Sequence, residues 1–147
     1  MGALTEAIKD PARRRAIIDD GVRVVDQEVS RKSGMSGFAV KAGFRVVKGV
    51  KPSIVGEALN MFLDDFAIKV DPYYDRCQQA GGNLRAFFVS NSEAIADDLL
   101  GIVDARAQRA KHRTLKKAYF KLRPQGKKHT KEAMPAVAGL VERHITK

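Results

Sequence analysis

Apolar residues recur at helical spacing along nearly the whole chain, and this periodicity constrains the fold more than any other feature. One stripe recurs at i, i+4, i+7 and i+11, and it consists of Ile18, Val22, Val25 and Val29. Because residues at this spacing share one side of an α-helix, they predict an amphipathic helix. The one short β-like run is Phe87–Ser90, and it lies between helix signals. The sequence therefore predicts an all-α fold.

Residues that favour helix ends divide these stripes into separate elements. Asp10-Pro11 and Asp71-Pro72 each predict a helix start. Asp accepts hydrogen bonds from free backbone N–H groups, and Pro suits the first helical position. Ser90 stands three residues before a glutamate, which is the spacing of a capping box, and Thr130 predicts the cap of a last helix.

Three glycine- or proline-containing segments predict turns, and they are Gly34–Gly37, Ala80–Asn83 and Arg123–Gly126. The first is expected to end a helix, with Ser33 or Ser36 capping the next one. These boundaries predict a single compact domain, residues 1–147, of six or seven helices joined by short turns. A chain of 147 residues can bury roughly 70% of its unfolded surface, so its core needs no disulfide or metal.

The net charge of +10 comes entirely from the C-terminal third of the chain. Residues 1–100 contain 14 basic and 14 acidic residues, whereas residues 101–147 contain 13 basic and only three acidic ones. From Ala105 to Lys131 there are 11 basic residues and no acidic residue. An asymmetry of this kind predicts an anionic partner.

The basic segment contains a candidate phosphate-binding surface. The helix predicted for Thr114–Leu122 turns its apolar stripe toward the core, so its lysines and arginines face outward. Such a surface is attracted wherever phosphates are dense, as in nucleic acid. The alternative is a cationic helix face that is only solvated. The residues expected to contact phosphates are Arg106, Arg109, Arg113, Lys116, Lys117, Lys121, Lys127 and Lys128.

Two further features could extend this surface. Phe120 projects toward the basic side, where an exposed ring could stack on an unpaired base; otherwise it fills a groove of a neighbouring helix. A helix predicted from about Gly37 to Val50 carries three cations on one ridge, and they are Lys41, Arg45 and Lys48. Because like charges on one ridge repel each other, they are expected to pair with acids of a neighbouring helix or to meet an external anion.

No residue pattern predicts catalysis, a metal site or a cofactor. Three pairs of carboxylates are adjacent in sequence, namely Asp19/Asp20, Asp64/Asp65 and Asp97/Asp98. Neighbours on a helix point about 100° apart, so the two carboxylates of each pair splay and do not converge on one substrate. Two pairs from different helices could still meet. Two of the histidines lie among lysines and arginines, and the single cysteine excludes a Cys-x-x-Cys zinc site. We therefore expect a non-enzymatic protein without a metal or a small-molecule cofactor.

The expected compartment is the cytoplasm. The single cysteine, Cys77, can form no internal disulfide, which suits a reducing compartment. The longest uncharged stretch, Ala133–Val141, is far shorter than the ~20 apolar residues of a spanning helix. Charges at Glu6 and Lys9 interrupt the region where a signal peptide would be apolar.

Five segments together carry a family resemblance, and they are Asp10–Arg14, Lys32–Phe44, Lys51–Val55, Asp71-Pro72 and Val141–His144. With them, the chain resembles a family of small bacterial proteins catalogued only as a domain of unknown function. The resemblance covers nearly the whole chain and implies a bacterial, cytoplasmic, helical protein. The family has no established activity, so the resemblance implies no functional residue.

The leading hypothesis for function is binding of a polyanion, and nucleic acid without sequence specificity is the one expected. If about five cations contact phosphates, log K should fall with log[salt] at a slope near −4 to −5. The alternative is a protein-interaction module or a homo-oligomer, in which the basic region meets an acidic partner. Peripheral binding to an anionic membrane ranks lower, because the apolar face of Thr114–Leu122 is small.

Overall fold

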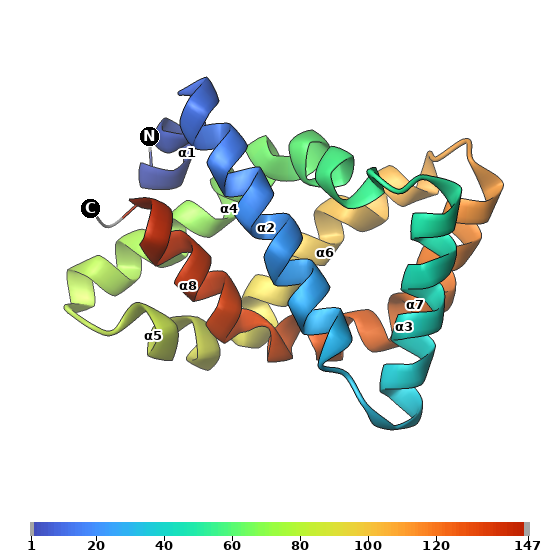
Figure 1. Ribbon diagram of the computed structural model, residues 1–147. Helices are drawn as coiled ribbons and strands as arrows, with labels where there is room; N and C mark the ends of the chain where they lie inside the picture. The colour runs from blue at the N-terminus through green and yellow to red at the C-terminus, as the bar shows by residue number, and fades with distance from the viewer. Residues whose placement is uncertain (1, 146–147) are drawn as a thin grey trace.

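The computed structural model describes residues 2–145, and within them eight helices follow one another with short connections (Figure 1). They are α1 (Ala3–Ala7), α2 (Pro11–Ser30), α3 (Gly34–Val50), α4 (Ile54–Ala80), α5 (Leu84–Ser90), α6 (Ser92–Gln108), α7 (Arg113–Glu132) and α8 (Met134–Ile145). The all-α prediction is confirmed. The predicted number of six or seven is too low, because the sequence pattern reveals neither the short α1 nor α5, which contains the β-like run Phe87–Ser90.

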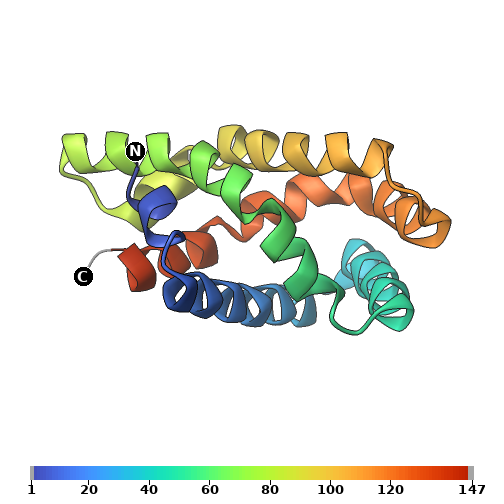
Figure 2. The same ribbon diagram turned by 90° about the horizontal axis from the view of Figure 1, so that it is seen from above.

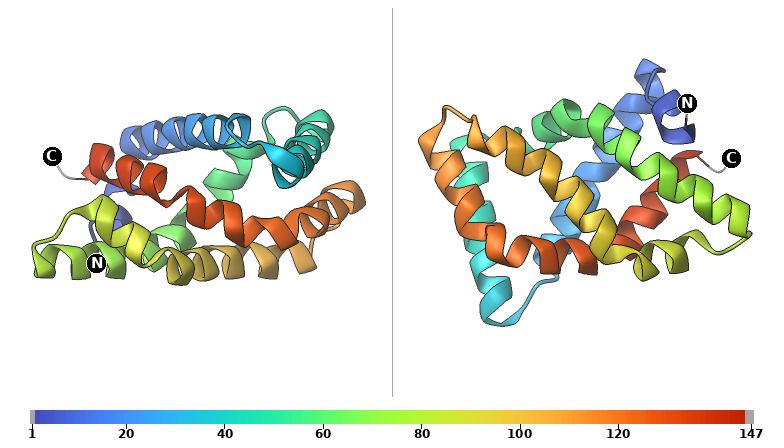
Figure 3. Two further views of the ribbon diagram at one scale, coloured as in Figure 1. Left: turned by 90° about the horizontal axis from the view of Figure 1, so that it is seen from below. Right: turned by 180° about the vertical axis from the view of Figure 1, so that it is seen from behind.

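The helices form two outer layers with α7 and α8 between them (Figure 2). α6 and the C-terminal part of α4 lie in one layer, and α2 and α3 lie in the other. Two further views show α8 against α5 at one end of the molecule and α7 against α3 at the opposite end (Figure 3). None of the helices described for residues 2–145 combines the length and the apolar character needed to cross a bilayer.

The core lies where α1, α4, α5, α6 and α8 meet. Its fully buried large side chains are Cys77, Phe88, Ile95 and Met134. Burying a side chain of this size contributes about 1.5–3 kcal/mol to folding. The Sγ atom of Cys77 lies 3.5 Å from the carbonyl oxygen of Gly82 and is closed off from solvent. This cysteine is therefore a packing residue.

Two predicted boundaries are confirmed. α2 begins at Pro11 with Asp10 at its N-cap position, as the dipeptide predicts, but the Asp10 side chain forms no capping hydrogen bond. α4 ends at Ala80, and Gly81 takes the left-handed conformation with φ of 68°. Glycine adopts this conformation without the steric cost that other residues incur, so the turn predicted for Ala80–Asn83 follows directly from its sequence.

The predicted helix start at Asp71-Pro72 is wrong, because α4 continues through both residues. The Asp71 carboxylate does not cap its own helix. It caps α1, where it accepts a hydrogen bond from the backbone N–H of Thr5 at 3.1 Å. A Cβ on Gly2 would lie 2.1 Å from the Asp71 Cγ atom, so only glycine allows this approach. Pro72 is exposed, and solvent can satisfy the backbone carbonyl that its missing N–H leaves free.

The predicted turn at Arg123–Gly126 is also wrong as a helix end, because α7 runs through it to Glu132. The chain does change direction here: α7 bends midway along its length (Figure 3), and Pro124 stands in its middle. Proline removes one helical hydrogen bond and is the commonest cause of such a bend. Thr130 therefore lies inside α7 and does not cap α8, which begins at Met134.

Of the serines predicted to cap helices, Ser33 holds its N-cap position and Ser90 does not. Gly34–Gly37 is not a turn but the first turn of α3, with Ser33 at the N-cap position and no side-chain cap hydrogen bond. The side chain of Ser36 lies outside what the structure describes. Ser90 is the last residue of α5, and Asn91 occupies the N-cap position of α6. Glycine and serine favour both helix caps and turns, so their positions in the sequence do not separate the two.

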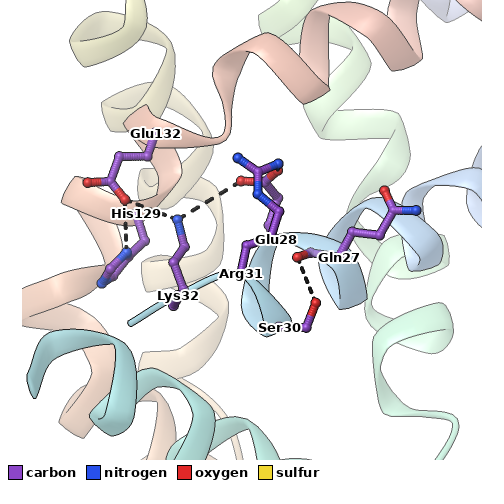
Figure 4. A network of polar contacts seen from close by, with 7 residues as sticks. All are labelled: Gln27, Glu28, Ser30, Arg31, Lys32, His129 and Glu132. Atoms are coloured by element: carbon purple, nitrogen blue, oxygen red, sulfur yellow. Dashed lines mark hydrogen bonds and ion pairs between the residues drawn. The ribbon is translucent and has the colours of Figure 1, made fainter. Parts of the chain in front are cut away.

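A network of polar contacts joins the C-terminal end of α2 to the second half of α7 (Figure 4). The Nζ atom of Lys32 lies 3.0 Å from Glu132 and 4.0 Å from Glu28. The Nδ1 atom of His129 lies 3.2 Å from the same Glu132 oxygen. Hydrogen bonding from Lys32 lowers the pKa of Glu132, so the carboxylate stays ionised and holds α7 beyond its bend.

Candidate functional site

The first half of α7 carries the candidate site, and local contacts set its orientation. The Nδ1 atom of His112 accepts a hydrogen bond from the backbone N–H of Leu115 at 3.4 Å and caps the helix. Asp104 of α6 accepts hydrogen bonds from Arg123, with Nε and Nη2 each at 2.8 Å, and from the hydroxyl group of Tyr119. The bonds from Arg123 lower the pKa of Asp104, so this clamp is ionic at neutral pH.

A close approach to α3 holds the other side of α7. A Cβ on Gly43 would lie 2.6 Å from a methyl carbon of Leu122, closer than real side chains approach. Glycine therefore lets the two helices meet at this point. With α6 on one side and α3 on another, the remaining side of α7 faces solvent.

Three exposed cations occupy that solvent-facing side: Arg113, Lys117 and Lys121. They recur every four residues, so at 100° per residue they span an arc of about 80° and a length of about 12 Å. Within residues 2–145, no acidic side chain forms an ion pair with any of them. We call these three residues the α7 basic face.

Three other predicted contacts gather around the turn between α6 and α7. Arg106, Arg109 and Lys116 line an apolar cavity beside the α7 basic face.

Phe120 is half-buried, and its ring packs edge-to-face on Tyr119 with centroids 5.2 Å apart. Part of its surface is thus used inside the fold and is not free to stack on a base.

The last two predicted contacts lie elsewhere. The Nζ atom of Lys127 is 3.1 Å from Asp97 and 3.4 Å from Glu93, and the hydrogen bond with Asp97 raises the pKa of Lys127. It links α7 to α6 within the protein. Lys128 is exposed, but it lies in the half of α7 beyond the bend, beside the network of Figure 4.

The ridge on α3 does not join the α7 basic face. Lys41, Arg45 and Lys48 lie about 140–200° around the helix from Gly43, which is the residue that contacts α7. The Nζ atom of Lys48 lies 3.5 Å from Asp26 of α2 and 5.2 Å from the centroid of the Phe44 ring. The ridge therefore forms a separate cationic surface, partly paired with α2.

The adjacent carboxylates point to different partners. Asp20 contacts Arg143 and His144, Asp64 contacts Arg14, and Asp98 accepts from the hydroxyl of Tyr73 at 2.7 Å. Within residues 2–145, no three His, Cys, Asp or Glu side chains lie close enough to hold a metal ion together.

Sequence reasoning missed an exposed apolar surface on α3. Met35 and Phe38 are 90% and 75% exposed, and Phe38 lines a groove of about 490 Å³ between α3 and α7. Lys117 and Lys121 line the same groove. The apolar residues themselves are present in the sequence, but Met35 stands within the segment that is interpreted as a turn. Only the start of α3 at Gly34 shows that Met35 belongs to this helix.

The fold and this surface define a small all-α protein with an unpaired basic face on one helix. The chain belongs to a family of unknown function, DUF6918, whose profile matches residues 4–145. The resemblance to a domain of unknown function is thereby confirmed over nearly the whole chain. No curated protein and no solved structure matches the chain.

Proposed function

We propose that this protein is a non-catalytic helical protein that binds nucleic acid through the α7 basic face. The observation that carries the proposal is the set of three exposed, unpaired cations on one side of α7: Arg113, Lys117 and Lys121. In the isolated protein these charges repel each other. Phosphates of a polyanion relieve that repulsion and release their condensed counterions, which drives binding.

The binding we propose is independent of base sequence, because contacts to phosphates carry no sequence information. A bacterial and cytoplasmic setting belongs to the same proposal. The cytoplasmic part is supported by the single cysteine, Cys77, which is buried and has no second cysteine with which to pair.

The test is a fluorescence anisotropy titration of labelled duplex and single-stranded DNA at several salt concentrations. Three phosphate contacts should give a slope of log K against log[salt] of about −3 on duplex DNA. Replacing both lysines in Lys117→Gln/Lys121→Gln should reduce the slope to about −1 and weaken binding at low salt. Absence of binding at about 50 mM salt would refute the proposal, because electrostatic affinity is high there.

The matched control is Lys127→Gln/Lys131→Gln, which removes the same charge from the same helix. Lys127 and Lys131 already pair with Glu93, at 3.4 and 3.5 Å. Their replacement should change the slope by less than about one unit. Equal losses for the two double variants would mean that only the net charge matters and that the α7 basic face has no specific role.

A second candidate is docking of an acidic protein segment, and the exposed apolar residues of α3 favour it. Phe38 and Val46, 75% and 48% exposed, line one side of the groove beside Lys117 and Lys121. Self-association through this groove would bring lysines of two copies together, so an acidic partner fits its charge better. Gel filtration with light scattering tests self-association, and titration with a labelled poly-glutamate peptide tests the acidic partner. Binding of the peptide without affinity for DNA would favour this candidate.

Binding to an anionic membrane surface is the third and lowest-ranked candidate. Co-sedimentation with phosphatidylglycerol vesicles tests it directly. Binding to vesicles in the absence of DNA binding would place this candidate above the first.

A further inference from the structure

A cavity of about 490 Å³ lies beside the turn between α6 and α7. The ends of α3 and α6 and the beginnings of α4 and α7 form its walls, and most of the lining side chains are apolar. They include Val47, Ile54, Phe62, Val103, Leu115 and Leu122. Volume and lining are those of cavities that hold small organic ligands, which combine apolar walls with a few polar groups.

Three cations line this cavity, and none has an acidic partner within residues 2–145. The Nε atom of Arg106 donates only to the thioether sulfur of Met61, at 3.1 Å. The Nζ atom of Lys116 donates to the backbone carbonyl oxygen of Gln108 at 3.2 Å. The side chain of Arg109 is exposed and has no hydrogen-bond or ion-pair partner in the part of the chain that the structure describes. Thioether sulfur is a weak acceptor, so the guanidinium of Arg106 lacks the anion that it binds best.

Among the described residues that line the cavity, Glu57 is the one acid, and its carboxylate already has partners. Its carboxylate lies 2.8 Å from the Nζ atom of Lys51 and 2.6 Å from the hydroxyl oxygen of Ser53. These hydrogen bonds lower the pKa of Glu57, so the carboxylate stays ionised and bound to them. It therefore forms no ion pair with Arg106, Arg109 or Lys116. Asp65 lines a neighbouring pocket together with both arginines, but within residues 2–145 it forms no ion pair with either of them.

We infer that this cavity binds a single-chain amphiphile with an anionic head group. The hydrocarbon chain lies inside the cavity, and the head group contacts Arg106 and Arg109. Apolar walls favour the alkyl chain, because they remove it from water. Guanidinium groups present parallel N–H donors that match the oxygens of a carboxylate or a phosphate. A neutral alkyl chain would leave all three cations unpaired. The inference is independent of nucleic-acid binding, since its residues are not those of the α7 basic face.

The test is isothermal titration of the full chain with dodecanoate, dodecyl phosphate and dodecanol below their aggregation limits. Either anionic amphiphile should bind at a 1:1 ratio, and dodecanol at least about ten-fold more weakly, because it offers no charge to the arginines. The anion that binds more tightly identifies the preferred head group as a carboxylate or a phosphate. Equal affinity for dodecanol, or no binding of either anion, would overturn the inference. Binding to phosphatidylglycerol vesicles without binding of either free amphiphile would also overturn the inference.

Variants separate the cavity from general attraction to a basic protein. Arg106→Ala/Arg109→Ala should weaken dodecanoate binding about ten-fold or more. Lys117→Ala/Lys121→Ala removes the same charge outside the cavity and should weaken it less than about two-fold. Equal losses in both variants would contradict a specific site.

Filling the cavity tests whether the alkyl chain of the ligand lies inside it. Ala58→Phe places a ring among the lining residues and should abolish binding of dodecanoate while leaving the DNA affinity unchanged. Ala58 is half-buried, so Ala110→Trp at the exposed rim serves as a second variant that does not disturb the core. Retained dodecanoate affinity in a folded cavity-filling variant would place the ligand elsewhere and overturn the inference.

Discussion

The carboxylate of Asp71 accepts a hydrogen bond from the backbone N–H of Leu4 at 2.8 Å, across 67 residues of sequence. It also accepts from the hydroxyl group of Thr5 at 2.5 Å. The first N–H groups of a helix have no partner inside that helix. A buried residue in the middle of α4 therefore completes the N-terminus of α1 and holds it on the core.

Replacing Asp71 by alanine should lower the free energy of unfolding by about 2 kcal/mol, because it leaves the first N–H groups of α1 without an acceptor. Urea unfolding followed by circular dichroism measures the change. Asp75→Ala is the matched control, since Asp75 lies one helical turn further along α4 and is exposed. The control should change stability by less than about 0.5 kcal/mol. Equal losses of stability in the two variants would show that Asp71 does not stabilise the protein by capping α1.

Replacing Pro72 by alanine should stabilise the protein by about 1–2 kcal/mol, because α4 passes through this position without ending. Alanine restores the missing helical hydrogen bond, and the gain is partly offset by a more flexible unfolded chain. The shift in the midpoint of thermal unfolding gives the sign of the change in stability. Destabilisation would instead support the sequence-based interpretation, in which Asp71-Pro72 begins a helix.

The contact between Gly43 and Leu122 predicts a reversal of sign. Gly43→Ala should destabilise the wild-type protein, because its Cβ would meet Leu122. In a Leu122→Ala background the same substitution should stabilise by up to about 1 kcal/mol, since alanine favours helix and the clash is gone. A double-mutant cycle measures the coupling. Additive effects would show that α3 and α7 do not meet at this residue.

Asp20 should make stability depend on pH below about 4, near the value at which a free aspartate protonates. Burial opposes ionisation of Asp20, but the hydrogen bonds from Arg143 and His144 outweigh it and lower its pKa from the ordinary 3.8. A lowered pKa in the folded state means that ionised Asp20 stabilises the protein fully above pH 3.8. This contribution is lost as the pH falls through the lower, folded-state pKa.

The variant Asp20→Asn should therefore be less stable than wild type by about 1–3 kcal/mol at pH 6, and the difference should shrink as the pH falls below 4. Urea titrations at several pH values measure it. Asp19→Asn is the control, because Asp19 is exposed and should show no such loss. A difference between wild type and Asp20→Asn that persists unchanged at low pH would contradict the ionic role of Asp20.

Part of the candidate site follows from sequence alone. Helical spacing on Thr114–Leu122 correctly separates the apolar stripe from outward cations such as Lys117 and Lys121, because periodicity is a local property of the helix. It does not tell which cations find acids on another helix. Lys127 and Lys121 are both predicted to contact phosphates, yet Lys127 pairs with Asp97 of α6.

By itself the sequence determined that the chain is all helical, where α2 starts, where α4 ends, and that the excess charge lies in the last third. These properties depend on spacing, on glycine at Gly81 and on composition, which act over a few residues. Only the tertiary structure decided that Asp71 caps α1, that Pro124 stands within a bent α7, and which cations remain unpaired. The cap and the ion pairs depend on partners far along the chain, and packing of the helices brings those partners together.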